Sequence, residues 1–273
     1  MELINHKYKI IEKIGEGNFG TIYKGENIRT RELVAIKVEP IEKDIKLLKN
    51  ESIIYQYLTN VHGIPSVKWF GKDTTNYYMV LNLLGPSLQT IKNNQLNSFS
   101  LKLVLQIGIK VVLLLKTIHE KKLVHRDVKP DNFLFGLNNE NNDIYIIDFG
   151  FCKTFMDGDC HIEETKTSNI IGSITYASIN SHKCIELSRR DDLESLGYML
   201  VYLYLGYLPW QELSHSISQI QHMKETLIET ISLPRALSEF IHYVRSVEFK
   251  EEPQYKTYCD MFLREIETIQ KRS

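Results

Sequence analysis

The spacing of apolar residues changes along the chain from the period of strands to the period of helices. Apolar and polar residues alternate through 8–38 in three runs, YKIIEKI, TIYKGENI and ELVAIKVE, which predict three strands joined by turns. Residues 42–58 change to a helical period, and strand signals return at 66–83. This first part of the chain therefore predicts a small β-rich lobe that carries one helix.

The remainder of the chain has a mostly helical pattern after a Gly-Pro-Ser turn at 85–87. Short strands are expected only at 133–135 and 144–147, on either side of a polar loop. The pattern predicts an α+β fold with two lobes, the second larger and helical. We expect one domain over 1–273, with an N-terminal lobe at about 1–81, a hinge at 82–87 and a C-terminal lobe at 88–273.

Composition and charge exclude several classes of protein. Of the 273 residues, 43% are hydrophobic and the net charge is −1, so neither a disordered chain nor a nucleic-acid or membrane-surface binder is indicated. The apolar stretches at 101–119 and 193–210 are interrupted by lysines or too short for a bilayer, and predict core helices. The N-terminus is charged and unlike a signal peptide, and the four cysteines lack zinc-type spacing. We expect an intracellular protein, cytoplasmic or nuclear, with reduced thiols.

A glycine run at Gly15–Gly20 matches the pattern GxGxxG, which is typical of loops that bind phosphates. A dinucleotide-binding turn of this kind opens a helix. The residues that follow, TIYKG, are β-branched and aromatic and favour a strand instead. The glycines therefore predict a hairpin that covers phosphates, with a purely structural hairpin as the alternative.

Lys37 ends the apolar run Val-Ala-Ile-Lys in the third predicted strand. In the helix that follows, Leu48, Glu51 and Tyr55 are spaced three and four apart and share one face. An unpaired carboxylate on a largely apolar face would destabilise the fold, and Lys37 is the simplest candidate for its ion-pair partner. A Lys37–Glu51 pair beneath a glycine loop can hold the α- and β-phosphates of a nucleotide, whereas the alternative is an ordinary surface lysine.

The most specific motifs are HRDxKxxN at 125–132 and Asp-Phe-Gly at 148–150. Asp127 can orient and deprotonate a hydroxyl group, and Lys129 can reach a γ-phosphate. Asn132 and Asp148 carry oxygen atoms that suit magnesium between phosphates. Any one of these residues could belong to an ordinary loop, but their order and spacing after GxGxxG and Lys37 favour phosphoryl transfer.

With these motifs the sequence resembles the eukaryotic protein kinases, and more narrowly the casein kinase I group. Ser-Ile-Asn at 178–180 stands where most kinases have Ala-Pro-Glu, and LLGPSLQ at 83–89 and LPWQ at 208–211 are similar to that group. The resemblance implies a serine/threonine kinase with the two-lobed kinase fold, which uses ATP and Mg²⁺ and acts on protein substrates.

The resemblance also implies roles for individual residues. Asp192 would anchor the catalytic loop, Leu81 matches the gatekeeper, and Asn82–Leu84 match the hinge that binds adenine through its backbone. Catalytic roles fall to Asp127, Lys129, Lys37 and Glu51, and metal binding to Asn132 and Asp148. The nucleotide would contact Ile14, Gly15, Glu16, Gly17, Asn18, Phe19, Gly20, Thr21, Ile22, Ala35, Lys37, Leu81, Asn82, Leu84, Leu134 and Ile147.

The chain departs from the casein kinase I group where that group collects cations for acidic or phosphorylated substrates. Thr175 occupies the position of an arginine, Ser168 that of a lysine, and the segment after LPWQ has Ser218 and Gln221. We therefore expect a weakened preference for primed or acidic substrates. Arg126 and Lys153 are the cations that remain there.

Two further expectations concern activity and assembly. The activation segment offers acids that could neutralise Arg126 in place of a phosphate: Asp157, Asp159, Glu163 and Glu164. We expect an enzyme that needs no phosphorylation of this segment and that is a monomer. The alternative is a catalytically weak pseudokinase that acts as a nucleotide-binding scaffold, although such proteins usually lack one of the catalytic residues that this chain retains.

Overall fold

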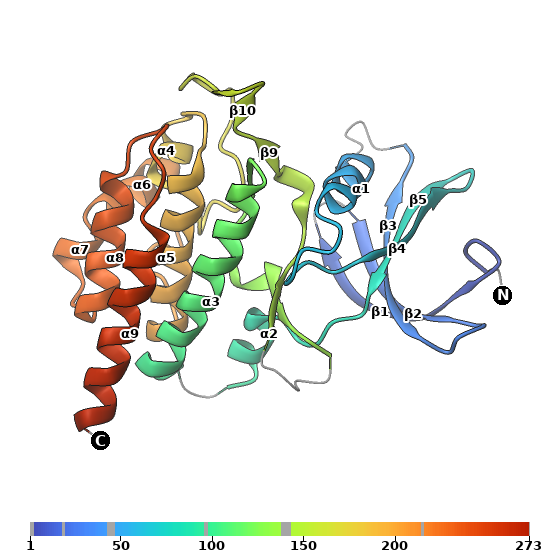
Figure 1. Ribbon diagram of the computed structural model, residues 1–273, viewed down its shortest axis with the longest axis horizontal. Coiled ribbons are helices and arrows are strands. Elements are labelled where there is room, and N and C mark those ends of the chain that lie inside the picture. The colour runs from blue at the N-terminus through green and yellow to red at the C-terminus, as the bar shows by residue number, and fades with distance from the viewer. Residues whose placement is uncertain are drawn as a thin grey trace. The chain divides into compact units, whose positions relative to one another are not determined.

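The structure is a computed structural model that describes residues 3–17, 20–42, 47–95, 98–137, 143–213 and 216–272 (Figure 1). The chain packs into two compact units. The first unit comprises residues up to Pro86 together with Phe133–Gly150, and the second comprises Ser87–Asn132 together with the chain from Phe151 onward. The lobe boundaries expected from the sequence stay a prediction.

A five-stranded antiparallel sheet forms the first unit, in the strand order β1-β2-β3-β5-β4. The expected strands are confirmed, and the helix expected at 42–58 is present over its described part. A β7–β8 hairpin lies at the predicted positions. The elements are β1 (Tyr8–Gly17), β2 (Gly20–Asn27), β3 (Leu33–Pro40), α1 (Leu47–Tyr57), β4 (Val67–Lys72), β5 (Asn76–Asn82), β7 (Phe133–Phe135), β8 (Ile144–Ile146) and the 3₁₀ turn η2 (Phe149–Phe151).

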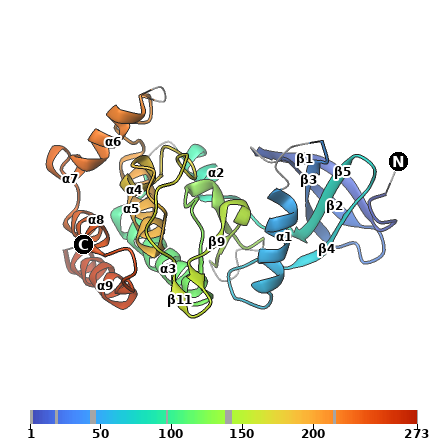
Figure 2. The same cartoon turned by 90° about the horizontal axis from the view of Figure 1, so that it is seen from above.

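The two faces of this sheet have different environments. Directly paired residues of antiparallel strands point to the same face, and alternate residues of one strand point to opposite faces. Ile36 pairs with Val80, and both join Tyr8 and Val34 in a buried apolar cluster on one face. Lys37 belongs to the other face, where α1 packs against β4 and β5 (Figure 2). The sheet thus separates an apolar core from a face that carries charge.

Helices dominate the second unit. The two apolar stretches form α3 and α5, and α3 packs against both α5 and α9 (Figure 1). Both are core helices, as predicted, and every residue of α5 from Asp191 to Leu203 is buried. Within the described ranges, no helix is both long and apolar enough to cross a membrane. The helices are α2 (Leu88–Asn93), α3 (Leu101–Glu120), η1 (Pro130–Asn132), α4 (Ile179–His182), α5 (Arg189–Leu205), α6 (Ile217–Glu225), α7 (Leu227–Thr230), α8 (Arg235–Ser246) and α9 (Tyr255–Arg272).

The second unit also contains short strands that the sequence pattern did not predict. These are β6 (Leu123–Val124), β9 (Lys153–Thr154), β10 (Met156–Asp157) and β11 (Cys160–His161). β6 pairs with β9, and β10 pairs with β11. The expectation that strands after the Gly-Pro-Ser turn lie only at 133–135 and 144–147 was wrong, because a two-residue strand is too short to produce an alternation in the sequence.

Candidate active site

Lys37 lies between two carboxylates in the first unit. Its Nζ atom is 2.7 Å from Glu51 Oε2 and 3.1 Å from Asp148 Oδ1. The side chains of Lys37 and Glu51 are only 11% and 2% exposed, so this is a buried ionic cluster. The ion pair expected from the sequence is present, and its role in holding phosphates stays a prediction.

The charges in this cluster depend on one another. Burial alone would lower the pKa of Lys37, but the carboxylates of Glu51 and Asp148 outweigh it and hold that pKa above its usual value. Burial raises the pKa of Glu51, and the contact of Glu51 with Lys37 opposes this rise. Lys37 therefore stays protonated, and its charge is available to a nucleotide phosphate.

Helix α1 holds Glu51 beside Lys37 because hydrogen bonds fix the helix on either side of Glu51. The buried Glu39 of β3 accepts a hydrogen bond from the backbone N–H of Leu48 at 3.0 Å, near the first residue of α1. One turn beyond Glu51, the hydroxyl of Tyr55 accepts the N–H of Asp148 at 3.3 Å. The ring of Tyr55 also packs edge-on against Phe149 at 4.9 Å. The buried face predicted for this helix is thereby confirmed.

The glycine run forms the predicted hairpin. Gly17 pairs with Gly20 at the end of β1 and β2, and a strand follows instead of a helix, so the dinucleotide-binding alternative is wrong. A side chain at Gly20 would place a Cβ atom 2.2 Å from the carbonyl oxygen of Val38, which explains the need for glycine. Asn18 and Phe19, at the tip of the run, lie outside the described residues.

Several predicted nucleotide residues share the sheet face of Lys37. Ile22 pairs directly with Lys37, and Ala35, two residues earlier in β3, pairs with Leu81 of β5. Gly15 pairs with Ile22, so one row of paired residues connects the glycine hairpin to Lys37. This arrangement offers an apolar surface beside a buried cation.

The other predicted nucleotide residues have varied surroundings. The side chain of Ile14 is 48% exposed. Glu16 forms an exposed ion pair with Lys13, and Thr21 pairs with Val38. Leu134 lies in β7, and Ile147 directly follows β8. Their contact with a nucleotide stays a prediction.

The predicted hinge has the backbone groups that an adenine would need. Asn82 is fixed by Ser66, whose N–H donates to Asn82 Oδ1 at 3.0 Å. Gly85 donates its N–H to the carbonyl of Phe135 at 2.8 Å. Between these two anchors, the backbone N–H groups of Leu83 and Leu84 have no hydrogen-bond partner in the part of the chain that the structure describes. They are free to bind a ligand.

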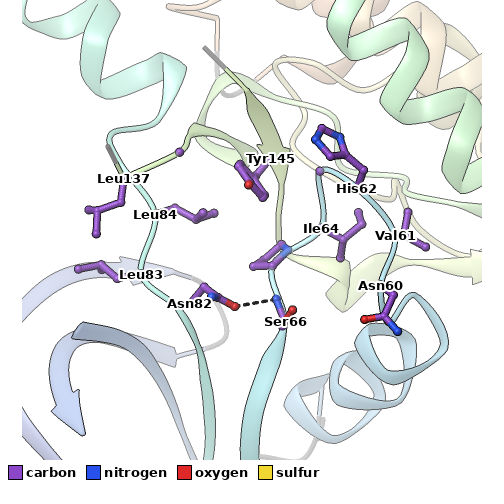
Figure 3. A pocket seen from close by; sticks show the side chains of 13 residues that line it. Asn60, Val61, His62, Ile64, Ser66, Asn82, Leu83, Leu84, Leu137 and Tyr145 are labelled. Carbon is purple, nitrogen blue, oxygen red and sulfur yellow. Dashed lines mark hydrogen bonds between the residues drawn. The ribbon is translucent and has the colours of Figure 1, made fainter. Parts of the chain in front are cut away.

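A pocket of about 420 Å³ lies beside the same hinge (Figure 3). It is lined by the connection between α1 and β4, by the hinge and by the β7–β8 hairpin. Of the predicted nucleotide residues only Asn82 and Leu84 line it, so this pocket is not the nucleotide site expected from the sequence. Its lining is Asn60, Val61, His62, Gly63, Ile64, Pro65, Ser66, Asn82, Leu83, Leu84, Gly136, Leu137 and Tyr145.

A second ionic cluster surrounds Asp127 in the second unit. Lys129 Nζ lies 2.7 Å from Asp127 Oδ2, and the backbone N–H of Ser173 donates to Asp127 Oδ1 at 2.8 Å. Asn132 donates through Nδ2 to the carbonyl oxygen of Asp127 at 2.8 Å. The carboxylate is buried, and a cation, one backbone N–H and a side-chain amide hold it, as a group that must keep one orientation requires.

Asp192 fixes the backbone on which Asp127 lies. It accepts the N–H groups of His125 and Arg126, each at 2.7 Å, and lies 2.9 Å from the ring of His119. Arg126 has a positive φ of 67°, a conformation that L-residues adopt only when their surroundings support it. Hydrogen bonds to the ionised form outweigh burial and lower the pKa of Asp192.

Ser173 belongs to this cluster, and the sequence analysis missed it. Its hydroxyl accepts a hydrogen bond from Lys129 Nζ at 3.0 Å, in addition to its backbone contact with Asp127. The preceding Gly172 has φ of +83°, and a Cβ atom there would lie 2.3 Å from the carbonyl oxygen of Arg126. A glycine followed by a small hydroxyl residue shortly before the 178–180 stretch was the available signal.

The predicted metal ligands are divided between the two units. Asp148 belongs to the first unit and Asn132 to the second. Asn132 uses its amide nitrogen for both of its side-chain hydrogen bonds, and its Oδ1 atom has no partner among the described residues. Each residue by itself offers an oxygen donor of the kind that hard divalent cations prefer, and their joint binding of a metal ion stays a prediction.

The counter-ion of Arg126 is not one of the four acids expected from the sequence. Arg126 instead lies 3.5 Å from Glu186, and Glu186 also binds Lys153 at 2.7 Å. Glu163 pairs with Lys250, Glu164 pairs with Arg190, and within the described ranges Asp157 and Asp159 form no ion pair. The expectation was wrong because it considered only acids in the nearest loop.

Both remaining cations near the activation segment therefore pair with the same carboxylate, which offsets one of their two positive charges. Glu186 is only 7% exposed, so its contact with the largely buried Arg126 is little screened by water. Thr175 brings no charge, and its carbonyl oxygen accepts a hydrogen bond from Trp210 Nε1 at 2.8 Å. Gln221 faces Glu225 at 3.1 Å, and Ser218 is exposed on α6. This region lacks an unpaired cation cluster among the described residues.

The 178–180 stretch is tied to the buried helix α5. Ser178 donates its hydroxyl to Asp191 at 2.7 Å, and Asn180 donates its side-chain amide to the same oxygen atom at 3.0 Å. These bonds hold the end of the activation segment on a core helix.

Comparison with known families gives one match. The family model for the protein kinase domain matches residues 8–270, nearly the whole chain. Both ionic clusters lie within the matched residues.

Proposed function

Because this chain belongs to the protein kinase family, we propose that it is a serine/threonine kinase of casein kinase I type. Membership of the family makes it a phosphotransferase that uses ATP and a divalent metal and acts on proteins. The proposal adds the class of acceptor, the identity of the metal as Mg²⁺ and a weak preference for primed substrates.

The first unit binds the nucleotide in this proposal. Lys37, oriented by Glu51, holds the α- and β-phosphates, and the glycine hairpin covers them. The face formed by Ile22, Ala35 and Leu81 receives the adenine ring. Asn132 and Asp148 would hold Mg²⁺, which would supply positive charge to the phosphate oxygens.

Asp127 orients the acceptor hydroxyl and accepts its proton. The acceptor oxygen forms a bond to the γ-phosphorus while the bond to the β–γ bridging oxygen breaks, and ADP leaves. Lys129 stabilises the charge that spreads over the γ-phosphate oxygens. The backbone N–H of Ser173 and the amide of Asn132 keep the Asp127 carboxylate in one orientation.

The proposal that the acceptor is a serine or threonine rests on the direct contact between Asp127 and Ser173. The backbone of residue 173 lies within hydrogen-bond distance of the catalytic carboxylate. A peptide resting on the chain that follows Ser173 therefore passes close to Asp127. A short serine or threonine side chain suits this spacing, whereas tyrosine carries its hydroxyl several ångströms further from its backbone.

A peptide-library phosphorylation screen with purified protein, ATP and Mg²⁺ tests this proposal. We expect phosphoserine and phosphothreonine but no phosphotyrosine, and loss of turnover in Asp127→Asn and Asp148→Ala. Turnover retained in both variants, with contaminating kinases excluded, would contradict the proposal. Nucleotide binding without turnover by the wild type would instead favour a pseudokinase scaffold.

The weak preference for primed substrates rests on charge. Reading a phosphate on a substrate requires available, preferably bidentate cations. Thr175 is neutral, and Arg126 and Lys153 are both engaged in ion pairs with Glu186. The same carboxylate supplies the negative charge that a phosphate provides in other kinases, which supports activity without phosphorylation of the activation segment. Treatment with a phosphatase should leave the initial rate unchanged.

Matched peptides test the preference directly. The pair differs only in a phosphoserine three residues before the acceptor, and kcat/KM is compared. We expect a ratio near one for the wild type and a rise of about tenfold in Thr175→Arg, the value of one charge-assisted hydrogen bond. A wild-type ratio above about tenfold would contradict this part of the proposal and leave the kinase assignment intact.

A further inference from the structure

The side chain of Lys224 on α6 is 0% exposed, although it carries an amine. Its Nζ atom contacts the carbonyl oxygens of Ile174 at 2.8 Å and Ala177 at 2.6 Å, and His182 Nε2 at 3.0 Å. An ammonium group has three N–H donors: the two carbonyl oxygens accept two of them, and His182 Nε2 accepts the third when the imidazole proton is on Nδ1. Among the described residues, no carboxylate lies within ion-pair distance of Lys224; burial lowers its pKa to about 7, and the more distant Glu194 opposes this shift.

Aromatic rings complete the surroundings of Lys224. The ammonium lies 4.9 Å from the ring centre of Tyr198 and 5.3 Å from that of Trp210, distances typical of cation–π contacts. Arg245 holds the end of α6 by donating to the carbonyl oxygen of Lys224 at 2.6 Å. Burying an amine is costly, and an apolar side chain of similar volume would fill the space more cheaply. The cation therefore contributes something other than packing.

The contacts of Lys224 converge on one short segment, residues 173–177. This segment begins at Ser173, which binds Asp127 and Lys129. Its carbonyl groups at 174 and 177 bind Lys224, and the carbonyl at 175 binds Trp210 Nε1. With these carbonyls held inward, the side chain of Ile174 is 37% exposed. The segment thus presents a fixed surface directly beside the Asp127 carboxylate.

We propose that Lys224 is a positioning residue for the protein substrate: it fixes segment 173–177 in the conformation that receives the acceptor peptide. The inference rests on the proposed function, because it takes Asp127 as the catalytic base. Lys224 itself touches neither the nucleotide residues nor Asp127. Its loss therefore weakens peptide binding and leaves nucleotide binding unchanged.

Steady-state kinetics of Lys224→Met test the proposal, because methionine keeps the volume and removes all three donors. We expect the KM for a serine peptide chosen from the library screen to rise about tenfold, as for one charge-assisted hydrogen bond. The KM for ATP and the rate of ATP hydrolysis without peptide should stay within about twofold of wild type. Trp210→Phe removes one donor to Thr175 and should raise the peptide KM by a smaller factor.

Phe262→Leu serves as the matched control for a general loss of stability. Phe262 is fully buried in α9 against Phe240 and does not touch segment 173–177. The melting temperature of the Phe262→Leu variant should fall while its KM for the peptide stays at the wild-type value. A peptide KM that rises as much in this control as in Lys224→Met would overturn the proposal.

The remaining outcomes are also decisive. An unchanged peptide KM in folded Lys224→Met overturns the inference. Should Lys224→Met fail to fold, Trp210→Phe decides, and a peptide KM equal to wild type overturns the inference. A wild type without turnover would contradict the proposed function itself, which separates that failure from failure of this inference.

Discussion

The two ionic clusters have the same kinds of groups but are held in different ways. Lys37 in the first unit and Lys129 in the second each lie 2.7 Å from a buried carboxylate. Lys37 forms ion pairs with two acids, Glu51 and Asp148, at once. Asp127, by contrast, also accepts the N–H of Ser173 and the amide of Asn132, so its carboxylate depends less on its lysine.

This difference separates two physical tasks. A lysine shared by two carboxylates leaves one negative charge in excess when both are ionised, and a bound phosphate would compete with them for the ammonium. A carboxylate that also accepts a backbone N–H and a side-chain amide keeps its position while its lysine interacts with a substrate. Nucleotide binding at the first cluster therefore affects the stability of the fold. At the second cluster, the fixed position of the carboxylate affects the rate of turnover.

Replacing each lysine by methionine should give the largest contrast. In Lys37→Met, the buried Glu51 and the partly exposed Asp148 lose their cation, and we expect the free energy of unfolding to fall by about 3 kcal/mol and ATP affinity to be largely lost. In Lys129→Met, Asp127 keeps its other donors. Stability should fall by less than about 1 kcal/mol, while kcat falls roughly 10²- to 10³-fold. Urea unfolding and steady-state kinetics measure both, and equal losses of stability would refute the comparison.

Replacing the carboxylates that hold backbone groups sharpens the contrast. In Asp192→Asn, the new amide must face one of two N–H groups, from His125 or Arg126, and we expect a loss of about 3 kcal/mol with a fall in kcat. Glu39→Gln is the matched control in the first unit. Its amide oxygen can still accept the single N–H of Leu48, so about 1 kcal/mol or less should be lost. If urea unfolding shows equal losses in the free energy of unfolding for the two variants, the number of backbone N–H groups that a carboxylate accepts does not determine its contribution to stability.

Glu186→Gln tests whether pairing with one carboxylate keeps Arg126 and Lys153 from binding a substrate phosphate. Releasing these cations should raise the primed-to-unprimed ratio of kcat/KM about fivefold, somewhat less than one full charge-assisted hydrogen bond. Glu164→Gln, which removes the ion pair with Arg190, should leave the ratio unchanged. If both variants give the wild-type ratio, the cations cannot reach a substrate phosphate.

The smallest effect is expected at Asp73, an exposed carboxylate in the turn between β4 and β5. Hydrogen bonds from Tyr78, and then from the N–H groups of Thr75 and Asn76, lower its pKa from 3.8 to about 2. Because the folded-state pKa is depressed, the stabilisation is present above the unfolded value and is lost as the pH falls from about 4 to 2.

Asp73→Asn should therefore be less stable than wild type at pH 5, by less than about 1 kcal/mol because the site is exposed. The difference should shrink as the pH approaches 2. Urea unfolding of both proteins across this range measures it. A difference that stays constant with pH would show that the charge of Asp73 contributes nothing, in contrast to the buried carboxylates.

Much of the fold could be predicted because its signals are local. Alternation marked the strands of the sheet, and the three- and four-residue spacing of Leu48, Glu51 and Tyr55 marked the buried face of α1. The motif at 125–132 identified Asp127, Lys129 and Asn132 of the cluster around Asp127, but not Ser173. The catalytic and nucleotide-binding roles of these residues stay predictions.

Tertiary structure decided which distant side chains meet. Arg126 pairs with Glu186, 60 positions away, and Lys224 with carbonyl groups about 50 positions away. The sequence showed that these charges exist but not which partner each has, because a lysine on a helix has the same local pattern whether it faces water or a buried carbonyl. Period and residue type are encoded in neighbouring positions, whereas burial and pairing depend on how separate elements pack against one another.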